Sequence, residues 1–118
     1  MSVEVGIKGR AEDVVSEKNT AQAACSGALP VFGTPFMTAL MEKAAWTSIA
    51  PYLAPGESTV GTKLDVSHDS ASPIGIKVWA ESEVTEVDGK RIELKVAAYD
   101  EKGMIGHGTH QRFIVTDE

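Results

Sequence analysis

Three polar side chains of this sequence stand in protected surroundings and could work together in chemistry. Glu42 lies in the mostly apolar segment GTPFMTALMEKAAWTSIA, and Thr34 stands where that segment begins. His68 falls on the apolar positions of a later alternating segment. A hydroxyl, a carboxylate and an imidazole in protected positions are the groups that acyl-transfer chemistry uses. The residue types therefore make acyl transfer the first hypothesis.

Each of these residues also has a purely structural interpretation. Glu42 could lie at the edge of a buried helix face and extend into solvent, since glutamate is a frequent helix residue. His68 could be a core or edge histidine with satisfied nitrogens. Thr34 could cap the helix, and a capping hydroxyl would still lie beside backbone N–H groups able to hold an oxyanion. The functional hypothesis requires Glu42 to line a pocket between helix and sheet, and His68 to face the helix.

One long helix would position the first two residues. Thr34-Pro35 is a helix-start signal, with Thr34 as the cap and proline at the first helical position. The helix is expected to run to about Ala50 and to end at Pro51. Its apolar residues recur at spacings of three and four, which predicts a broad buried face. That face would contain Phe36, Met37, Leu40, Met41, Ala44, Ala45 and Ile49.

An antiparallel sheet would position the remaining candidates. A strand is expected within residues 3–16, and four strands follow the helix. In the first of the four, alternation predicts one inner face made of Val60, Thr62, Leu64, Val66 and His68. In the last, from about Met104 to Thr116, one face would carry Gly106, Gly108, His110 and Arg112. Arg112 is either a contact for an anion or a member of a surface ion pair.

The turn at Asp88-Gly89 joins the two middle strands of this meander. A three-residue loop over residues 87–89, with Gly89 left-handed, would keep their apolar faces in phase. The order of strand, long helix and meander predicts an α+β fold, in which about five antiparallel strands wrap around one helix. The length of 118 residues fits a single domain over residues 1–118.

Composition and charge exclude several classes of function. The formal net charge of -6 argues against a nucleic-acid partner. No run approaches the roughly 20 apolar residues of a membrane helix. A single cysteine, Cys25, and the absence of a signal-peptide core predict a cytoplasmic protein. His107 and His110 are three apart in a strand and would point to opposite faces, so no metal site is expected.

Taken together, the candidate residues resemble those of the fluoroacetyl-CoA thioesterase family of hotdog-fold proteins, over roughly residues 5–116. The separations of 8 residues from Thr34 to Glu42 and of 26 from Glu42 to His68 carry the resemblance, together with Gly61 and Arg112. Further matching segments are Leu40-Met41-Glu42, Ala50-Pro51-Tyr52-Leu53, Pro55-Gly56-Glu57, Gly61-Thr62, Val66-Ser67-His68, Ser72-Pro73-Ile74-Gly75 and Gly106-His107-Gly108-Thr109-His110-Gln111-Arg112.

The resemblance implies a homodimer with an acyl-CoA substrate at the subunit interface and no further cofactor, because CoA is part of the substrate. It implies Thr34, Glu42 and His68 as the catalytic set. Gly61 would contribute a backbone contact to the acyl end or carbonyl, and Arg112 would organise the site. Glu42 would attack the thioester carbon or activate a water, while His68 assists proton transfer.

The resemblance also has a departure that concerns the acyl group. The family member selective for the fluorinated substrate carries bulky aromatic residues in a lid before the helix. Here that segment is Cys25–Pro30, which has none. We therefore expect a looser or different preference among short acyl groups.

Two other functions are compatible with the same elements. A non-catalytic hotdog module could bind acyl-CoA as a sensor or carrier, and measured turnover would separate it from an enzyme. A hotdog hydratase is disfavoured, because that class places an aspartate and a histidine near the helix start. The segment Gly33–Met41 has neither residue.

Overall fold

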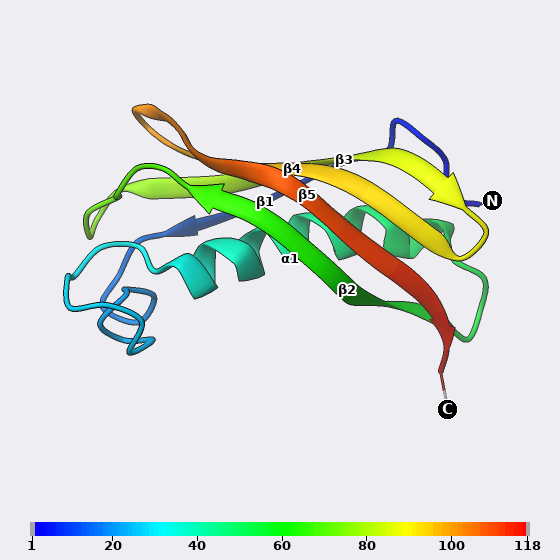
Figure 1. The fold of residues 1–118 in the computed structure, drawn as a ribbon, viewed down its shortest axis with the longest axis horizontal. Helices are drawn as coiled ribbons and strands as arrows, with labels where there is room; N and C mark the ends of the chain where they lie inside the picture. The colour runs from blue at the N-terminus through cyan, green and yellow to red at the C-terminus, as the bar shows by residue number, and fades with distance from the viewer. Residues whose placement is uncertain (1, 118) are drawn as a thin grey trace.

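The structure is a computed structural model that describes residues 2–117. That part of the chain forms a 16-residue helix, a short 3-10 helix and five strands (Figure 1). In chain order the elements are β1 (Lys8–Val14), α1 (Thr34–Ile49), η1 (Ala50–Tyr52), β2 (Glu57–His68), β3 (Lys77–Asp88), β4 (Arg91–Asp100) and β5 (Gly103–Thr116). The first strand is shorter than the predicted segment 3–16, and the long helix matches its predicted extent.

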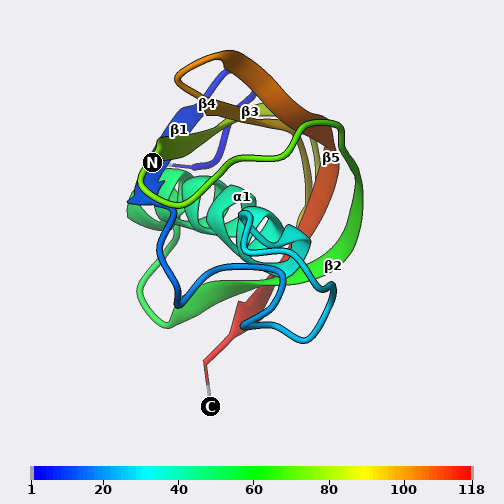
Figure 2. The ribbon, with the colours of Figure 1, turned by 90° about the vertical axis from the view of Figure 1, so that its left-hand side faces the viewer.

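The five strands form one antiparallel sheet that curves around α1. The strand order is β1-β3-β4-β5-β2, so β1 and β2 are the two edges. Figure 1 shows α1 lying lengthwise under the sheet, and the end-on view of Figure 2 shows the sheet bending around the helix. This confirms the predicted α+β fold, and a sheet wrapped around one long helix is the hotdog arrangement.

The face of α1 that meets the sheet forms the centre of the core. Its buried residues are Met37, Leu40, Met41, Ala44, Ala45 and Ile49. The buried apolar residues of β3 and β4 that complete the core are Val78, Ala80, Val84, Ile92, Leu94, Val96 and Ala98. Each large apolar side chain buried in this way contributes about 1.5–3 kcal/mol. The predicted helix face is confirmed, except that Phe36 is only partly buried.

Two glycines let the sheet approach α1 closely. A Cβ atom on Gly9 of β1 would collide with the carbonyl oxygen of Ala44. A Cβ atom on Gly106 of β5 would lie 2.8 Å from the sulfur of Met37. The missing side chains therefore determine how tightly the helix is seated in the sheet.

The first turn of α1 differs from the predicted one. The carbonyl of Gly33 accepts hydrogen bonds from the backbone N–H groups of Phe36 (3.0 Å) and Met37 (2.9 Å). Gly33 is therefore the N-cap and Thr34 the first helical residue. The prediction that Thr34 caps the helix is wrong, because the helical hydrogen bonds begin one residue earlier. The hydroxyl of Thr34 is thus available to another partner.

A β-bulge in β2 decides which side chains face the helix. The register of β2 against β5 shifts between Gly61 and Lys63, so Thr62 is the extra residue. Before the bulge Gly61 faces α1, whereas Val60 points outward and is 46% exposed. After it His68 faces the helix as predicted. The prediction that Val60 and Thr62 face inward is wrong, because one inserted residue moves every earlier side chain to the other face.

The apolar faces of β3 and β4 are in phase across their hairpin, but the feature that aligns them differs from the predicted one. Asp88 pairs with Arg91, so the loop has two residues instead of three. Gly89 is left-handed, with φ +62°, as predicted. The register shift lies inside β3, at Thr85. The bulge is therefore real, but it sits in the strand and not in the turn.

Candidate active site

Glu42 lies in the middle of α1, and two strands hold its carboxylate. Its side chain is 41% exposed, and its Oε2 lies 3.7 Å from Nη1 of Arg112 on β5. Gly61 on β2 faces the same oxygen, since a Cβ atom there would lie 2.7 Å from it. Gly61 and Arg112 are direct partners in the β2–β5 pairing. They form one cradle for the carboxylate and leave its other side open.

Arg112 is a buried residue under Glu42 and not a surface cation. It is 7% exposed, and its side chain is held by Thr59 of β2. Nε donates to the Thr59 hydroxyl at 2.8 Å, and Nη2 donates to the Thr59 carbonyl at 3.0 Å. Burial lowers the pKa of Arg112, and the negative charge of Glu42 partly opposes this. The guanidinium therefore has a defined orientation, with Nη1 toward Glu42.

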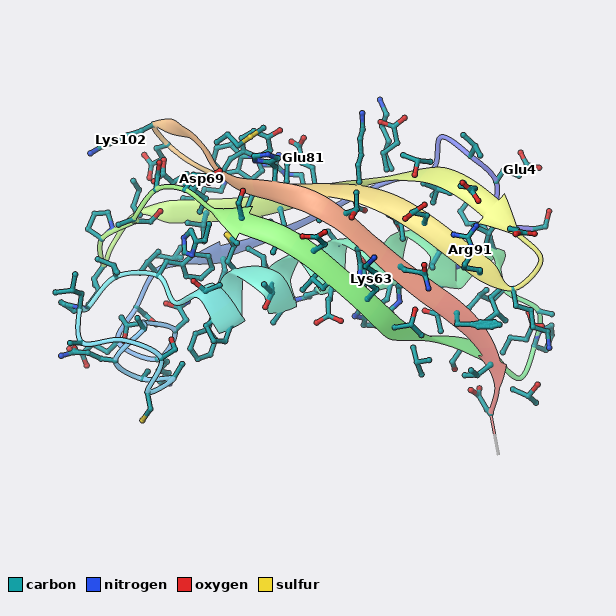
Figure 3. The ribbon with its side chains drawn as sticks, in the orientation of Figure 1. Glu4, Lys63, Asp69, Glu81, Arg91 and Lys102 are labelled. Atoms are coloured by element: carbon teal, nitrogen blue, oxygen red, sulfur yellow. The ribbon has the colours of Figure 1, made fainter. Side chains whose placement is uncertain are left out.

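His110 joins this cluster, and the sequence reasoning did not single it out. It is 1% exposed on the helix-facing side of β5. Its Nδ1 lies 2.8 Å from the carbonyl of Lys63, which is labelled near the middle of β2 in Figure 3. Its Nε2 lies 3.1 Å from Nη1 of Arg112. The predicted alternation of β5 placed His110 on the same face as Arg112, which was the available signal.

Thr34 and His68 form a second, separate pair. The Thr34 hydroxyl and Nδ1 of His68 are 2.8 Å apart. The other ring nitrogen of His68, Nε2, is buried and has no hydrogen-bond partner among the described residues. Burial lowers the pKa of His68, while the backbone of Ser70 and the charge of Asp69 act in the opposite direction. An unpartnered nitrogen beside an exposed hydroxyl is suited to receive a ligand or a proton.

The five candidate residues thus form two groups within one chain. Thr34 and Glu42 are eight residues apart on α1, which corresponds to about 12 Å along the helix axis. His68 and Gly61 are separated by about 20 Å along β2, allowing for the bulge. In Figure 3 the labels of Lys63 and Asp69 mark the residues that follow these two parts of β2. A single chain brings the members of each group together, but not the two groups.

The loop between β1 and α1 lies at the N-terminal end of α1 (Figure 1). Its neck is closed by a bridge between Thr20 and Phe32 and by the N–H of Ala21, which donates to the carbonyl of Val31 at 2.8 Å. Its tip, Cys25–Pro30, is exposed and contains no aromatic residue. The loop therefore presents a small, exposed segment without aromatic side chains at the end of α1 where Thr34 lies.

Residues 2–117 contain neither a cluster of metal-ligating side chains nor a membrane-spanning helix. No group of three or more His, Cys, Asp or Glu residues in this range could hold a metal ion. No helix in the same range is long and apolar enough to cross a membrane.

Comparison with known proteins gives consistent matches. The model of a family described as "FlK: Fluoroacetyl-CoA-specific thioesterase" matches residues 15–118. The fluoroacetyl-CoA thioesterase of Streptantibioticus cattleyicolor is 44% identical over 85 residues, which are 72% of this chain and 61% of that protein. The match thus spans less than two thirds of the relative's length.

Solved structures resemble the chain over nearly its whole length. The fluoroacetyl-CoA thioesterase FlK has a TM-score of 0.92 and 34% identity, covering 98% of this chain and 90% of that one. A single-residue mutant of FlK in complex with fluoroacetate and CoA has a TM-score of 0.90 and 36% identity, covering 97% and 96%. A thioesterase superfamily member from Thermus thermophilus has a TM-score of 0.89 and 28% identity, covering 97% and 85%.

Proposed function

Because this chain belongs to the fluoroacetyl-CoA-specific thioesterase family, we propose that it hydrolyses the thioester of an acyl-CoA with a short acyl group. The observation that supports this proposal most directly is the position of the Glu42 carboxylate, which is held on one side and exposed on the other. Gly61 and Arg112 hold it on one side, and its other side is open. A carboxylate held in this way can attack a thioester carbon or take a proton from water.

A second copy of the chain would complete the site. β2 is a 12-residue edge strand that pairs with β5 and with no other strand of the described residues, and such an edge is a template for another chain. If a two-fold axis passes between Leu64 and Asp65 of β2, the two β2 strands pair antiparallel and Gly61 lies opposite His68 of the partner subunit. The Glu42 cradle would then face the partner subunit's Thr34 and the partner's His68. We therefore propose a homodimer with composite sites.

In this site one water is consumed, the C–S bond breaks, and CoA leaves as its thiol. In one route Glu42 attacks the carbonyl carbon, and water then cleaves the acyl-enzyme anhydride. In the other Glu42 takes a proton from a water that attacks directly. The proton given up by the attacking water passes to His68, and the resulting imidazolium delivers a proton through Nε2 to the thiolate sulfur of CoA, which returns the ring to its neutral form; Thr34 holds the ring at Nδ1. Gly61 supplies a backbone contact to the acyl end, where a side chain would displace Glu42.

The acyl group is proposed to be short but not restricted to fluoroacetyl. The exposed tip Cys25–Pro30 has no aromatic side chain with which to enclose and select a small acyl group. Acetyl, propionyl and fluoroacetyl esters of CoA should therefore be hydrolysed at comparable rates. A cytoplasmic location is part of the proposal and rests on the single cysteine of the sequence.

The first experiment measures thiol release from a panel of short and medium acyl-CoAs. Wild type is compared with Glu42→Gln and with Glu81→Gln, an exposed glutamate of β3 that serves as the matched control. Glu42→Gln should lower kcat about 10²- to 10⁴-fold and leave CoA-ester binding nearly unchanged. Rapid-quench mass spectrometry distinguishes the two routes, because one of them leaves an acyl group on Glu42. Binding without turnover by wild type would instead indicate a non-catalytic acyl-CoA-binding module.

Mixing two inactive variants tests the composite site. Glu42→Gln and His68→Ala subunits are denatured together and refolded, so that about half of the dimers are mixed. In a composite arrangement each mixed dimer holds one intact site, and activity should return to about a quarter of the wild-type rate. If each site is built from a single chain, no mixed dimer has an intact site and no activity returns. A monomeric mass at all concentrations would also refute the dimer.

A further inference from the structure

The two contacts of His110 determine where its ring proton lies. The carbonyl of Lys63 can only accept, so Nδ1 of His110 must carry a hydrogen and donate it at 2.8 Å. Arg112 can only donate, so Nε2 must present a lone pair to Nη1 at 3.1 Å. His110 is therefore neutral and in the Nδ1–H tautomer. A positive charge on the ring would place two N–H groups against each other at Nε2.

The same nitrogen of Arg112 faces both His110 and Glu42. Nη1 lies 3.1 Å from Nε2 of His110 and 3.7 Å from Oε2 of Glu42. The other two nitrogens of the guanidinium are held by Thr59. Thr59 fixes the plane of the guanidinium, and His110 supplies the acceptor for one of the two hydrogens that this planar group directs from Nη1. Without this acceptor, a buried hydrogen of Nη1 would have no partner, and the whole guanidinium would tilt away from its place beside the carboxylate.

Two charged groups lie near His110, and its surroundings as a whole favour this neutral state. They are Arg112 on its own strand and Glu42 on α1, while β2 presents the carbonyl of Lys63. Burial lowers the pKa of His110, and the charge of Arg112 lowers it further. The Lys63 carbonyl and the charge of Glu42 act in the opposite direction. Near neutral pH the ring therefore keeps the lone pair that Arg112 needs.

We propose that His110 is a positioning residue of the reaction: its Nε2 lone pair orients Arg112, and Arg112 in turn holds Glu42 in place for attack or proton transfer. The inference rests on the proposed thioesterase activity. It goes beyond that activity by giving a role to a residue that does not touch the open side of the carboxylate. His110 acts on Glu42 through Arg112, and its hydrogen bond to the carbonyl of Lys63 holds the imidazole ring in place.

Two substitutions of His110 separate positioning from packing. The amide oxygen of glutamine can occupy the place of Nε2 and accept from Arg112, whereas the amide nitrogen of asparagine can replace Nδ1 and donate to Lys63. His110→Gln should therefore keep kcat within about threefold of wild type, and His110→Asn should lower it about 10- to 100-fold with KM little changed. A purely structural role would make both variants lose activity in proportion to their loss of thermal stability.

The pH profile gives a second readout. In wild type, protonation of His110 should contribute to the loss of kcat on the acid side. His110→Gln does not titrate and should shift that limb to lower pH, while the exposed His107→Gln should leave it unchanged. An acid limb that is the same in all three proteins would overturn the proposal.

A spectroscopic measurement on wild type covers the case in which the variants do not fold. Nitrogen-15 shifts of the imidazole near neutral pH should show protonated Nδ1 and unprotonated Nε2 for His110. The opposite tautomer or an imidazolium would overturn the inference. Absence of thiol release by wild type would refute the proposed function and this inference with it. Wild-type turnover with equal kcat losses in His110→Gln and His110→Asn would refute this inference alone.

Discussion

Replacement of Gly61 by alanine tests whether the position of the Glu42 carboxylate limits turnover. The added Cβ atom would lie 2.7 Å from Oε2 of Glu42, whereas ordinary van der Waals contact begins at 3.4 Å. The carboxylate must therefore move by about 0.7 Å, the difference between these distances. Because misplacement of a reacting group by about 1 Å can lower a rate 10²-fold, we expect kcat to fall about 10- to 100-fold.

The fold should tolerate the same substitution. The displaced atom is the far end of a flexible side chain, and the next contacts of the new Cβ, with Arg112 and His110, are at 3.3 Å. Alanine is also favoured over glycine inside a strand by about 0.5–1 kcal/mol, which offsets part of the strain. The variant should therefore unfold within a few degrees of wild type while losing most of its activity.

The assay compares kcat from thiol release with the midpoint of thermal unfolding. Val60→Ala is the matched control, because Val60 precedes Gly61 in β2 and points outward. It should retain wild-type kcat. A Gly61→Ala protein that folds normally and turns over at the wild-type rate would show that the position of Glu42 does not limit the reaction.

Three further predictions concern the second group and the stability of the fold. Thr34→Ala should lower kcat about tenfold by removing the 2.8 Å hydrogen bond to His68, whereas Thr34→Ser should not; equal rates would refute the assigned role. The contribution of His68 and His110 to the free energy of unfolding should be complete above about pH 6.5 and should decrease as the pH falls below that value. The reason is that burial lowers the folded-state pKa values of His68 and His110, so the unfolded chain binds more protons; a pH-independent urea midpoint would contradict this. Ser72→Ala should reduce the unfolding free energy by about 1–3 kcal/mol, because it removes the 2.8 Å hydrogen bond to the buried Asp100; a urea titration measures this, and an unchanged midpoint would contradict it.

The fold was predictable because the local signals of the sequence agree with one another. Apolar spacings of three and four specified the buried face of α1, and alternation specified the strands. These patterns reflect the geometry of a single element, in which the direction of each side chain repeats with a constant period. The wrapped sheet then follows, because one long apolar helix and an antiparallel meander can bury their faces against each other.

The errors of prediction arose where that period was interrupted. The bulge at Thr62 turns Val60 outward and Gly61 inward, and no alternation within β2 announces it. The bulge at Thr85 similarly replaced the predicted wide turn at Gly89. A bulge depends on which residues of the neighbouring strand form hydrogen bonds with the bulged strand. The sequence of one strand alone therefore does not predict its position.

By itself the sequence determined the elements of this protein and the chemical types of its candidate residues. A lone carboxylate in an apolar helix and an imidazole on an apolar strand face were visible without coordinates. Tertiary structure alone decided that Arg112 and His110 lie buried under Glu42, and that Thr34 bonds His68 instead of capping the helix. The physical reason is that spacing along a chain specifies directions within one element. Contacts between elements depend on register and packing, which residues distant in sequence establish together.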